Sequence, residues 1–285
     1  MNRRALLKGA AALAVTPWLS ACSRAPETNK APEAEAGKRL ERIGIGLYTV
    51  RDQMAEDVPG TLQKLAEIGY DEVEFAGYFD HAPAEIKGFL DASGLVSPSS
   101  HIRLEHIRTA PEQLIETAQT IGNSYVALAW LAPEERGTLD DYRGHIDLVA
   151  GFAEQCRDAG LQFTWHNHDF EFVELEGQRP IDLILDSTDP ELVRVELDLY
   201  WITKSGADPF AYFERYPGRF PLCHVKDMAA DTSMADVGDG TIDFAAIFAA
   251  SDLAGFKHYY VERDDAEDPM KSAANSYKAA SELTF

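Results

Sequence analysis

The sequence predicts an α/β protein in which eight parallel strands alternate with helices and close into a (β/α)8 barrel. From residue 42 onward, amphipathic stretches that end in Gly are repeatedly followed by a short β-prone run that ends on a polar residue. Eight such units fit into about 240 residues, a length typical of a closed barrel. No Gly-rich dinucleotide-binding fingerprint follows the first predicted strand, which disfavours an open Rossmann sheet.

The predicted strands cover residues 43–48, 72–76, 96–101, 125–130, 162–166, 193–198, 221–225 and 258–262. The clearest helices are predicted over residues 59–69, 111–122, 140–160, 243–255 and 268–283. Pro59 and Pro111 stand where a helix begins, and there the missing N–H of proline costs no hydrogen bond. Strands that alternate with helices indicate a parallel sheet covered by helices.

The segment ahead of the barrel has the features of an export signal and a tether. Residues 1–22 carry the pair Arg3-Arg4 before a short apolar run, which is typical of a twin-arginine signal. The run ends in Leu-Ser-Ala-Cys, a lipobox-like sequence that predicts lipidation of Cys22; a plain cleaved signal peptide or a short membrane anchor is the alternative. Residues 23–41, rich in Ala, Pro and Glu, predict a flexible tether, and residues 42–285 the barrel. We therefore expect a periplasmic protein that meets the membrane through a lipid anchor alone.

The net charge of −22, from 26 basic and 48 acidic residues, repels phosphate backbones. We therefore expect no nucleic-acid partner. Besides Cys22 the chain has Cys156 and Cys223, which are too few for a disulfide framework and are predicted to be buried free thiols. The oligomeric state is not predicted by these features.

Polar side chains stand at the ends of the predicted strands, where the catalytic residues of such barrels lie. They are Tyr48, Arg51, Glu74, His101, Trp130, His166, His168, Glu171, Asp198, His224, Lys226 and Glu262. A single strand-end Asp is often a helix N-cap, so it is the joint pattern that predicts a site. Carboxylates and imidazoles together form a mixed O/N donor set, which suits Mn²⁺, Mg²⁺, Co²⁺ or Zn²⁺.

From residue 42 to its end the chain resembles the xylose isomerase-like TIM barrels, the sugar phosphate isomerase/epimerase superfamily. The motifs that carry the resemblance are HNHDFEF, ELDLYW, HVKD and YVERD, at the ends of the last four strands. The resemblance implies one divalent metal ion held by Asp198, His224 and Glu262. The fourth ligand of the family is a strand-5 Glu, whose position falls on His166 here, with His168 or Glu171 as substitutes.

The resemblance also implies catalytic and substrate-binding residues. The acid/base candidates are His168, Glu262, Glu74 and His101, and Lys226 is a candidate donor to a developing oxyanion or leaving group. An ion pair between Lys226 and a neighbouring Asp is the alternative role. The substrate-binding candidates are Tyr48, Arg51, Trp130 and Trp201, the last standing where related enzymes often have His.

The function implied is a metal-dependent sugar isomerase or epimerase that acts through an enediolate on a keto-sugar or sugar derivative. Loss of the strand-5 Glu weakens a two-carboxylate epimerase mechanism, so a β-eliminating dehydratase or lyase on a 3-keto-glycoside is the alternative. A non-catalytic sugar-binding lipoprotein is an alternative of another class, which would explain export but not the polar strand ends. A nuclease, also found in this superfamily, is disfavoured by the charge.

Overall fold

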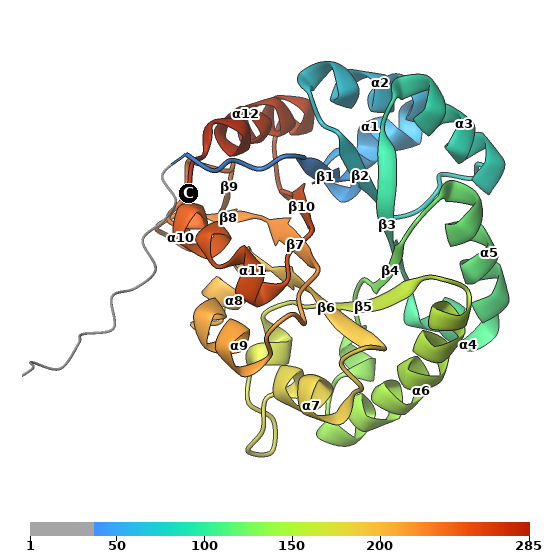
Figure 1. Ribbon diagram of the computed structural model, residues 1–285, viewed down its shortest axis with the longest axis vertical. Coiled ribbons are helices and arrows are strands. Elements are labelled where there is room, and N and C mark those ends of the chain that lie inside the picture. Colours follow the sequence, from blue (N-terminus) through green and yellow to red (C-terminus); the bar gives the residue numbers. More distant parts are fainter. Residues whose placement is uncertain (1–36) are drawn as a thin grey trace, which may run out of the picture. The chain divides into compact units, whose positions relative to one another are not determined.

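The computed structural model describes residues 37–285, which form a closed barrel of eight parallel strands surrounded by helices (Figure 1). Around the barrel the strands follow the order β1-β10-β7-β6-β5-β4-β3-β2, and β1 closes it by pairing with both β2 and β10. The predicted (β/α)8 TIM barrel is therefore confirmed.

The barrel strands lie close to their predicted positions. They are β1 (Gly44–Gly46), β2 (Glu72–Phe75), β3 (Val96–Ile102), β4 (Tyr125–Leu128), β5 (Gln162–His166), β6 (Val193–Asp198), β7 (Leu222–Val225) and β10 (His258–Val261). Two short strands, β8 (Asp227–Met228) and β9 (Met234–Ala235), form a separate antiparallel pair after β7. This pair, which the sequence analysis did not predict, belongs to the loop at the carboxyl end of the barrel.

The helices also follow the predicted pattern, with one correction. They are α1 (Arg51–Glu56), α2 (Val58–Ile68), α3 (Pro83–Ser93), α4 (Leu104–Thr109), α5 (Pro111–Ile121), α6 (Leu139–Asp158), α7 (Pro180–Ser187), α8 (Leu199–Lys204), α9 (Pro209–Arg215), α10 (Phe244–Ala249), α11 (Ser251–Ala254) and α12 (Pro269–Glu282), with 3₁₀ turns η1 (Leu47–Val50), η2 (Pro133–Glu135) and η3 (Phe170–Phe172). The single helix expected over residues 243–255 was wrong, because the chain leaves helical geometry at Ala250, which has ψ near 10°.

Local sequence signals explain where several helices begin and end. The Asp57 side chain accepts a hydrogen bond from the Gly60 N–H and caps α2, whose first turn contains Pro59. Helices α3 and α5 end at Gly94 and Gly122, which have φ of 78° and 96°. A left-handed residue at this position costs least when it is Gly, so the Gly-terminated pattern marks true helix ends.

Alternation along each strand divides the side chains between two environments. Successive strand residues point to opposite faces, so every second residue faces the barrel interior. The outward positions are apolar and almost fully buried against the helices; they include Val73, Phe75, Phe163, Trp165, Val195 and Leu197. The intervening positions carry Glu, Asp, His and Thr, which the barrel therefore gathers at its centre.

The first described residues lie against the C-terminus: the Phe285 N–H donates to the Lys38 carbonyl, and Arg39 donates to the Ser281 carbonyl. Cys156 and Cys223 are buried free thiols, as predicted. Arg3, Arg4 and Cys22 lie outside the described residues, so export and lipidation stay predictions.

Across residues 37–285, none of the helices combines the length and the apolar character needed to span a bilayer.

Candidate active site

A cavity of about 770 Å³ opens at the carboxyl ends of the strands. Eight of its lining residues matter for the chemistry below; they are Tyr48, His101, Trp130, His166, His168, Lys226, Glu262 and Asp264. Tyr48 and Trp130 are 45% and 47% exposed, whereas His166, Lys226 and Glu262 are buried. The cavity therefore combines open aromatic surfaces with a buried polar floor, the arrangement expected of a small-molecule site.

The first part of this floor is a cluster of histidines and glutamates from five strands. His101 Nε2 lies 2.8 Å from Glu196 Oε2 and 3.1 Å from Glu74 Oε2. His224 Nε2 lies 2.8 Å from Glu74 Oε2 and 3.4 Å from Glu196 Oε1. His166 Nδ1 lies 3.4 Å from Glu196 Oε2. Glu196 is thus the common neighbour of all three imidazoles.

Glu196 was not predicted from the sequence, although it is fully buried in the centre of the site. On β6 only the last polar residue of the strand, Asp198, was selected. Glu196 precedes Asp198 by two residues, and strand alternation places both on the interior face. Alternation read one step back along the strand would therefore have found it.

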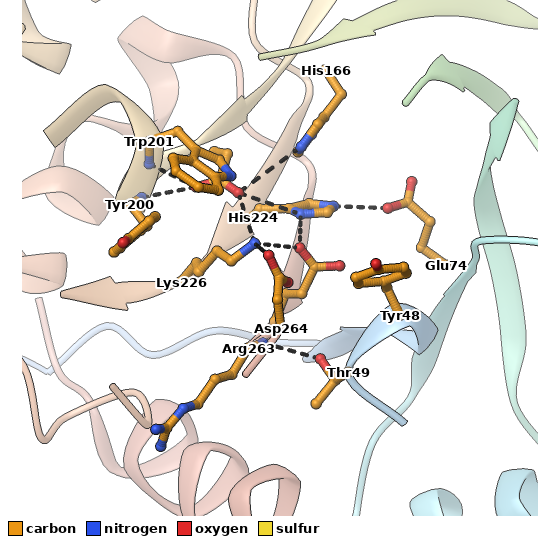
Figure 2. Close-up of polar contacts among 12 residues, drawn as sticks. Tyr48, Thr49, Glu74, His166, Tyr200, Trp201, His224, Lys226, Arg263 and Asp264 are labelled. Carbon is orange, nitrogen blue, oxygen red and sulfur yellow. Dashed lines mark hydrogen bonds and ion pairs between the residues drawn. The ribbon is translucent and has the colours of Figure 1, made fainter. Parts of the chain in front are cut away.

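The second part of the floor lies on the other side of His224. Its Nδ1 is 3.0 Å from Glu262 Oε2 and 3.9 Å from Asp198 Oδ2. The Lys226 ammonium lies 2.9 Å from Glu262, 3.6 Å from Asp198 and 2.7 Å from Asp264. Figure 2 shows His224 in the middle, with Glu74 at one nitrogen and Lys226 and Asp264 beyond the other. Asp264, two residues after Glu262, was also missed by the sequence analysis.

The four predicted metal ligands are brought together. His166 Nε2 lies 4.0 Å from Asp198 Oδ2, and Asp198 and Glu262 both approach His224. Asp198 Oδ1 caps α8 by accepting the N–H groups of Tyr200 and Trp201. Asp198 thus combines both roles considered from the sequence, a helix cap through one oxygen and a site residue through the other.

Two overlapping groups of candidate ligands occur among residues 37–285, each with its donor atoms within 4.8 Å of one another. The histidine-rich group consists of His101, His166, Glu196 and His224, and the acidic group of Asp198, His224 and Glu262. His224 belongs to both groups because its two ring nitrogens face opposite sides. The alternative ligands Glu171 and His168 are in neither group.

Glu171 instead supports the backbone beside the site. Its Oε2 accepts the His168 N–H at 2.8 Å, and Trp165 Nε1 approaches its Oε1 at 3.5 Å. The His168 ring lines the cavity, stacked on Phe170 and tilted toward Trp201 with ring centroids 5.1 and 5.4 Å away.

The remaining predicted substrate-binding residues differ in their access to the cavity. Arg51 stacks on Tyr48, with its guanidinium 4.4 Å from the ring centre, and donates to the Tyr48 and Asp264 carbonyls. Arg51 therefore holds the Tyr48 ring and backbone in position. Trp201 lies beneath the lining, with its ring centre 5.5 Å from the Lys226 ammonium. Tyr48 and Trp130 are left as the accessible aromatic surfaces.

Opposite charges dominate the protonation of the floor. Burial would lower the pKa of His101, but Glu74 and Glu196 raise it to about 10. Burial would raise the pKa of Glu74, but His101 and His224 hold it well below its ordinary value. Burial would likewise lower the pKa of Lys226, and the three carboxylates around it raise it instead. Glu74 is therefore an ionised carboxylate and Lys226 a charged ammonium at neutral pH.

In two other groups, Asp198 and His168, burial sets the direction of the pKa shift. Burial raises the pKa of Asp198 to about 6, although Lys226 and His224 oppose the shift. Burial, followed by the charge of Lys226, lowers the pKa of His168 to about 3. His168 is thus a neutral imidazole near pH 7, which can hydrogen-bond to a sugar hydroxyl.

The donor atoms fit a divalent cation. Four buried side-chain atoms of the floor have no hydrogen-bond partner among residues 37–285; they are Glu74 Oε1, His166 Nδ1, Glu196 Oε1 and Asp198 Oδ2. Buried polar atoms are normally paired, so such a cluster of unpaired nitrogen and oxygen atoms favours a bound ligand. Imidazole nitrogens and carboxylate oxygens are the donors that Zn²⁺, Co²⁺ and Mn²⁺ take in proteins.

Known proteins are similar to the chain in sequence and in fold. An inosose dehydratase of Geobacillus kaustophilus (strain HTA426) is 26% identical over 246 residues, which cover 72% of this chain and 77% of that protein. The crystal structure of a sugar phosphate isomerase/epimerase from Parabacteroides distasonis ATCC 8503 superposes with a TM-score of 0.73 at 27% identity, over 90% of this chain and 99% of that one. The IolI protein with a zinc atom superposes with a TM-score of 0.68 over 84% and 96% of the two chains; its 15% identity shows the fold alone.

The family model described as xylose isomerase-like TIM barrel matches residues 62–280, most of the described chain. This match agrees with the closed eight-stranded barrel and with the polar residues at its carboxyl end. The chain belongs to the xylose isomerase-like TIM barrel family.

Proposed function

We propose that the protein is a divalent-metal-dependent enzyme that removes a proton from the carbon next to the carbonyl of a keto-sugar or keto-polyol. The observation that carries this proposal is the buried histidine–carboxylate floor of the 770 Å³ cavity, in which four polar atoms have no hydrogen-bond partner among residues 37–285. The residues available to hold the ion are His101, His166, Glu196, Asp198, His224 and Glu262. A bound divalent ion supplies Lewis-acid polarisation of substrate oxygens.

The chain's own residues supply the proton transfers and the orientation of the substrate. Glu74 is an ionised carboxylate with one free oxygen, and we assign it as the general base. Lys226, a charged ammonium that lines the cavity, is the proton donor. Tyr48 and Trp130 offer flat apolar surfaces on which a sugar ring stacks.

We favour β-elimination as the outcome. Proton removal by Glu74 leaves an electron pair that forms the C=C bond. The neighbouring C–O bond then breaks, and the departing oxygen takes a proton from Lys226. This choice is supported by the similarity to inosose dehydratases. It is also supported by His166, which stands where the epimerases of the family carry a second carboxylate.

Isomerisation or epimerisation is the second candidate, and one observation favours it. Glu74 and Glu262 contact opposite nitrogens of His224, so two carboxylates flank the same point. A pair of carboxylates can take a proton from one position and return it at another. The similarity to the Parabacteroides sugar phosphate isomerase/epimerase agrees with this outcome.

The test is to incubate the metal-loaded protein with a panel of keto-inositols, keto-sugars and 3-keto-glycosides in D2O. Elimination is expected to release water or an alcohol and to form an enone, seen by mass spectrometry and ultraviolet absorbance. Isomerisation or epimerisation would place deuterium on carbon without loss of an oxygen. His224→Gln is the control, because His224 belongs to both ligand groups, and it should abolish either reaction.

Deuterium incorporation or elimination with at least one substrate would support the proposal. Tight binding of a sugar by the metal-loaded protein, without any C–H exchange across the panel, would overturn it and favour a sugar-binding protein.

A further inference from the structure

A second, smaller hollow lies beside the catalytic cavity, between the barrel and helices α4 and α5, and its volume is about 310 Å³. Val126 lines it from β4; this residue is the register partner of Phe163 and, like Phe163, points outward from the barrel. Leu114 and Thr117 line it from α5. We call this hollow the side pocket. Apart from His101, none of the residues that form the histidine–carboxylate floor lines it.

The side pocket adjoins the catalytic cavity. Four residues line both spaces; they are Ala76, His101, Ile102 and Arg103. The His101 ring also contacts two glutamates of the floor, at 2.8 and 3.1 Å. A group bound in the side pocket would therefore touch an imidazole that borders the reaction centre. One molecule can occupy both spaces, with its reacting part over the floor and a second part in the side pocket.

The lining of the side pocket favours an apolar group. Aliphatic side chains form much of its wall; they are Ala76, Ile102, Ala110, Leu114, Ala118 and Val126. Protein interiors normally contain few voids larger than a water molecule, so a hollow of this size favours a bound group over loose packing. An apolar cavity of about 150 Å³ binds benzene, so a hollow about twice as large accommodates one or two aromatic rings. Gln113 and Thr117 add polar atoms for substituents on such rings.

The loop between β2 and α3, which forms one wall of the side pocket, holds an unfavourable backbone conformation. Gly77 and Tyr78 line the pocket from this loop. The next two residues, Phe79 and Asp80, have φ of 51° and 62°. Left-handed residues other than Gly cost free energy, and such strain is concentrated at binding and catalytic segments. The strained loop agrees with a wall that is shaped for a ligand.

We propose that the side pocket binds an aromatic aglycone, so that the substrate is a keto-glycoside rather than a free keto-sugar or keto-polyol. The keto-sugar ring lies in the catalytic cavity, and the aglycone passes His101 into the side pocket. This inference rests on the proposed function for the position of the keto-sugar. The affinity of the side pocket for an aromatic group does not depend on any reaction and is measured separately.

The first test is binding of 2-naphthol, a two-ring aglycone without a sugar, to the full chain, followed by ligand-observed NMR and fluorescence. We expect a dissociation constant of about 1 mM or below. Thr117→Trp places a large side chain in the side pocket and should weaken binding by at least about tenfold. Thr120→Trp is the matched control, because Thr120 is an exposed residue on the same helix and does not line the pocket.

Ala110→Phe guards against a Thr117→Trp protein that fails to fold. Ala110 lines the side pocket from the junction of α4 and α5, so a larger side chain there narrows the same space from another element. We expect the same loss of 2-naphthol binding. Thermal melts of all variants show which of them are folded.

The second test compares methyl and phenyl 3-keto-glucosides in the D2O assay. Burial of the larger aglycone should raise kcat/KM for the phenyl compound by about 10–100-fold over the methyl compound. Thr117→Trp should reduce this ratio to within about threefold of one, whereas Thr120→Trp should keep the wild-type ratio.

Three outcomes would overturn the inference: no binding of 2-naphthol to the wild type, equal binding to the wild type and to a folded Thr117→Trp or Ala110→Phe protein, or equal kcat/KM for the methyl and phenyl compounds. The last result would leave the proposed function intact. Binding of 2-naphthol that only the side-pocket variants lose, without reaction of either glucoside, would support the side pocket and count against the proposed function.

Discussion

Glu72 and Glu74 are two residues apart on β2, both are buried, and they do different things. Glu72 begins the strand and pairs with His258 at 2.7 Å and with Arg42 at 3.4 Å, one partner for each oxygen. Glu74 lies further along, shares one oxygen between His101 and His224, and has no partner for the other among residues 37–285. The same residue type thus has two roles on β2: the carboxylate of Glu72 is fully paired, whereas Glu74 keeps one oxygen available for a reaction.

The difference follows from the direction of the strands. All eight barrel strands are parallel, so Glu72 lies near their amino ends and Glu74 nearer their carboxyl ends. In such barrels the amino end contributes stability and the carboxyl end contributes chemistry. Glu72 and Glu74 follow this rule: both oxygens of Glu72 are paired, whereas one oxygen of Glu74 is unpaired within the described chain.

The largest effect that would sharpen this comparison is expected for Glu74→Gln. A neutral amide cannot accept the substrate proton, so we expect turnover per folded molecule in the D2O assay to fall by about 10²–10⁴-fold. Because His101 and His224 lose a charged partner, we also expect a lower melting temperature. Glu72→Gln is the matched control. It should cost about 1–3 kcal/mol of stability, lowering the melting temperature by several degrees, with turnover per folded molecule unchanged.

Calorimetry and kcat measured on both variants check this contrast. It would break if Glu72→Gln lost turnover as severely as Glu74→Gln while remaining folded.

Asp227 tests what determines whether a buried carboxylate contributes to stability or to turnover: its position along the barrel axis, or whether its oxygens are already hydrogen-bonded. It follows Lys226 at the catalytic end, yet its two oxygens accept the backbone N–H groups of Met228, Gly238, Gly240 and Ile242. Asp227→Ala leaves these donors unpaired, so we expect a loss of about 2–4 kcal/mol in the free energy of unfolding.

If hydrogen bonding of the carboxylate determines its role, the folded Asp227→Ala protein should retain most of its turnover, measured at a temperature well below its melting point. A loss of turnover equal to that of Glu74→Gln, without a change in stability, would show that position along the barrel axis alone determines the role of the carboxylate. Asp243→Ala is a suitable comparison variant, since Asp243 caps the neighbouring helix α10 through a single N–H.

The fold was predictable because it depends on local patterns. Gly-terminated helices and alternating apolar positions located all eight barrel strands, and the bounds of β5 and β6 match the prediction. The break at Ala250 was not predictable, because the amphipathic pattern continues through it.

The sequence predicted most of the residues that form the site, but not which of them contact one another. His224 and Glu74 are 150 residues apart, and only the closed barrel sets them 2.8 Å from each other. Glu196 was not predicted because only the last polar residue of β6, Asp198, was selected, and Asp264 because nothing beyond Glu262 was selected after β10. That Lys226 lies between Glu262, Asp198 and Asp264 depends on three strand ends at once, which no local pattern encodes.

Glu171 offers the smallest and most specific test, because it is a buried carboxylate whose two oxygens accept N–H groups of His168 and Trp165. Burial raises its pKa from 4.5 to about 8. The folded protein therefore holds this proton more tightly than the unfolded chain, so the stabilisation is fully present below pH 4.5 and is lost as pH rises through about 8.

Glu171→Gln cannot ionise, so the melting temperature of the wild type should fall below that of the variant by a growing margin of a few degrees between pH 6 and pH 9. Thermal melts of the two proteins measure this margin, since every other titrating group is common to both. Glu174→Gln, at an exposed position on the same loop, is the matched control. If the melting temperatures of the wild type and Glu171→Gln change in parallel with pH, the Glu171 carboxylate is ionised in the folded protein and is stabilised by its N–H donors alone.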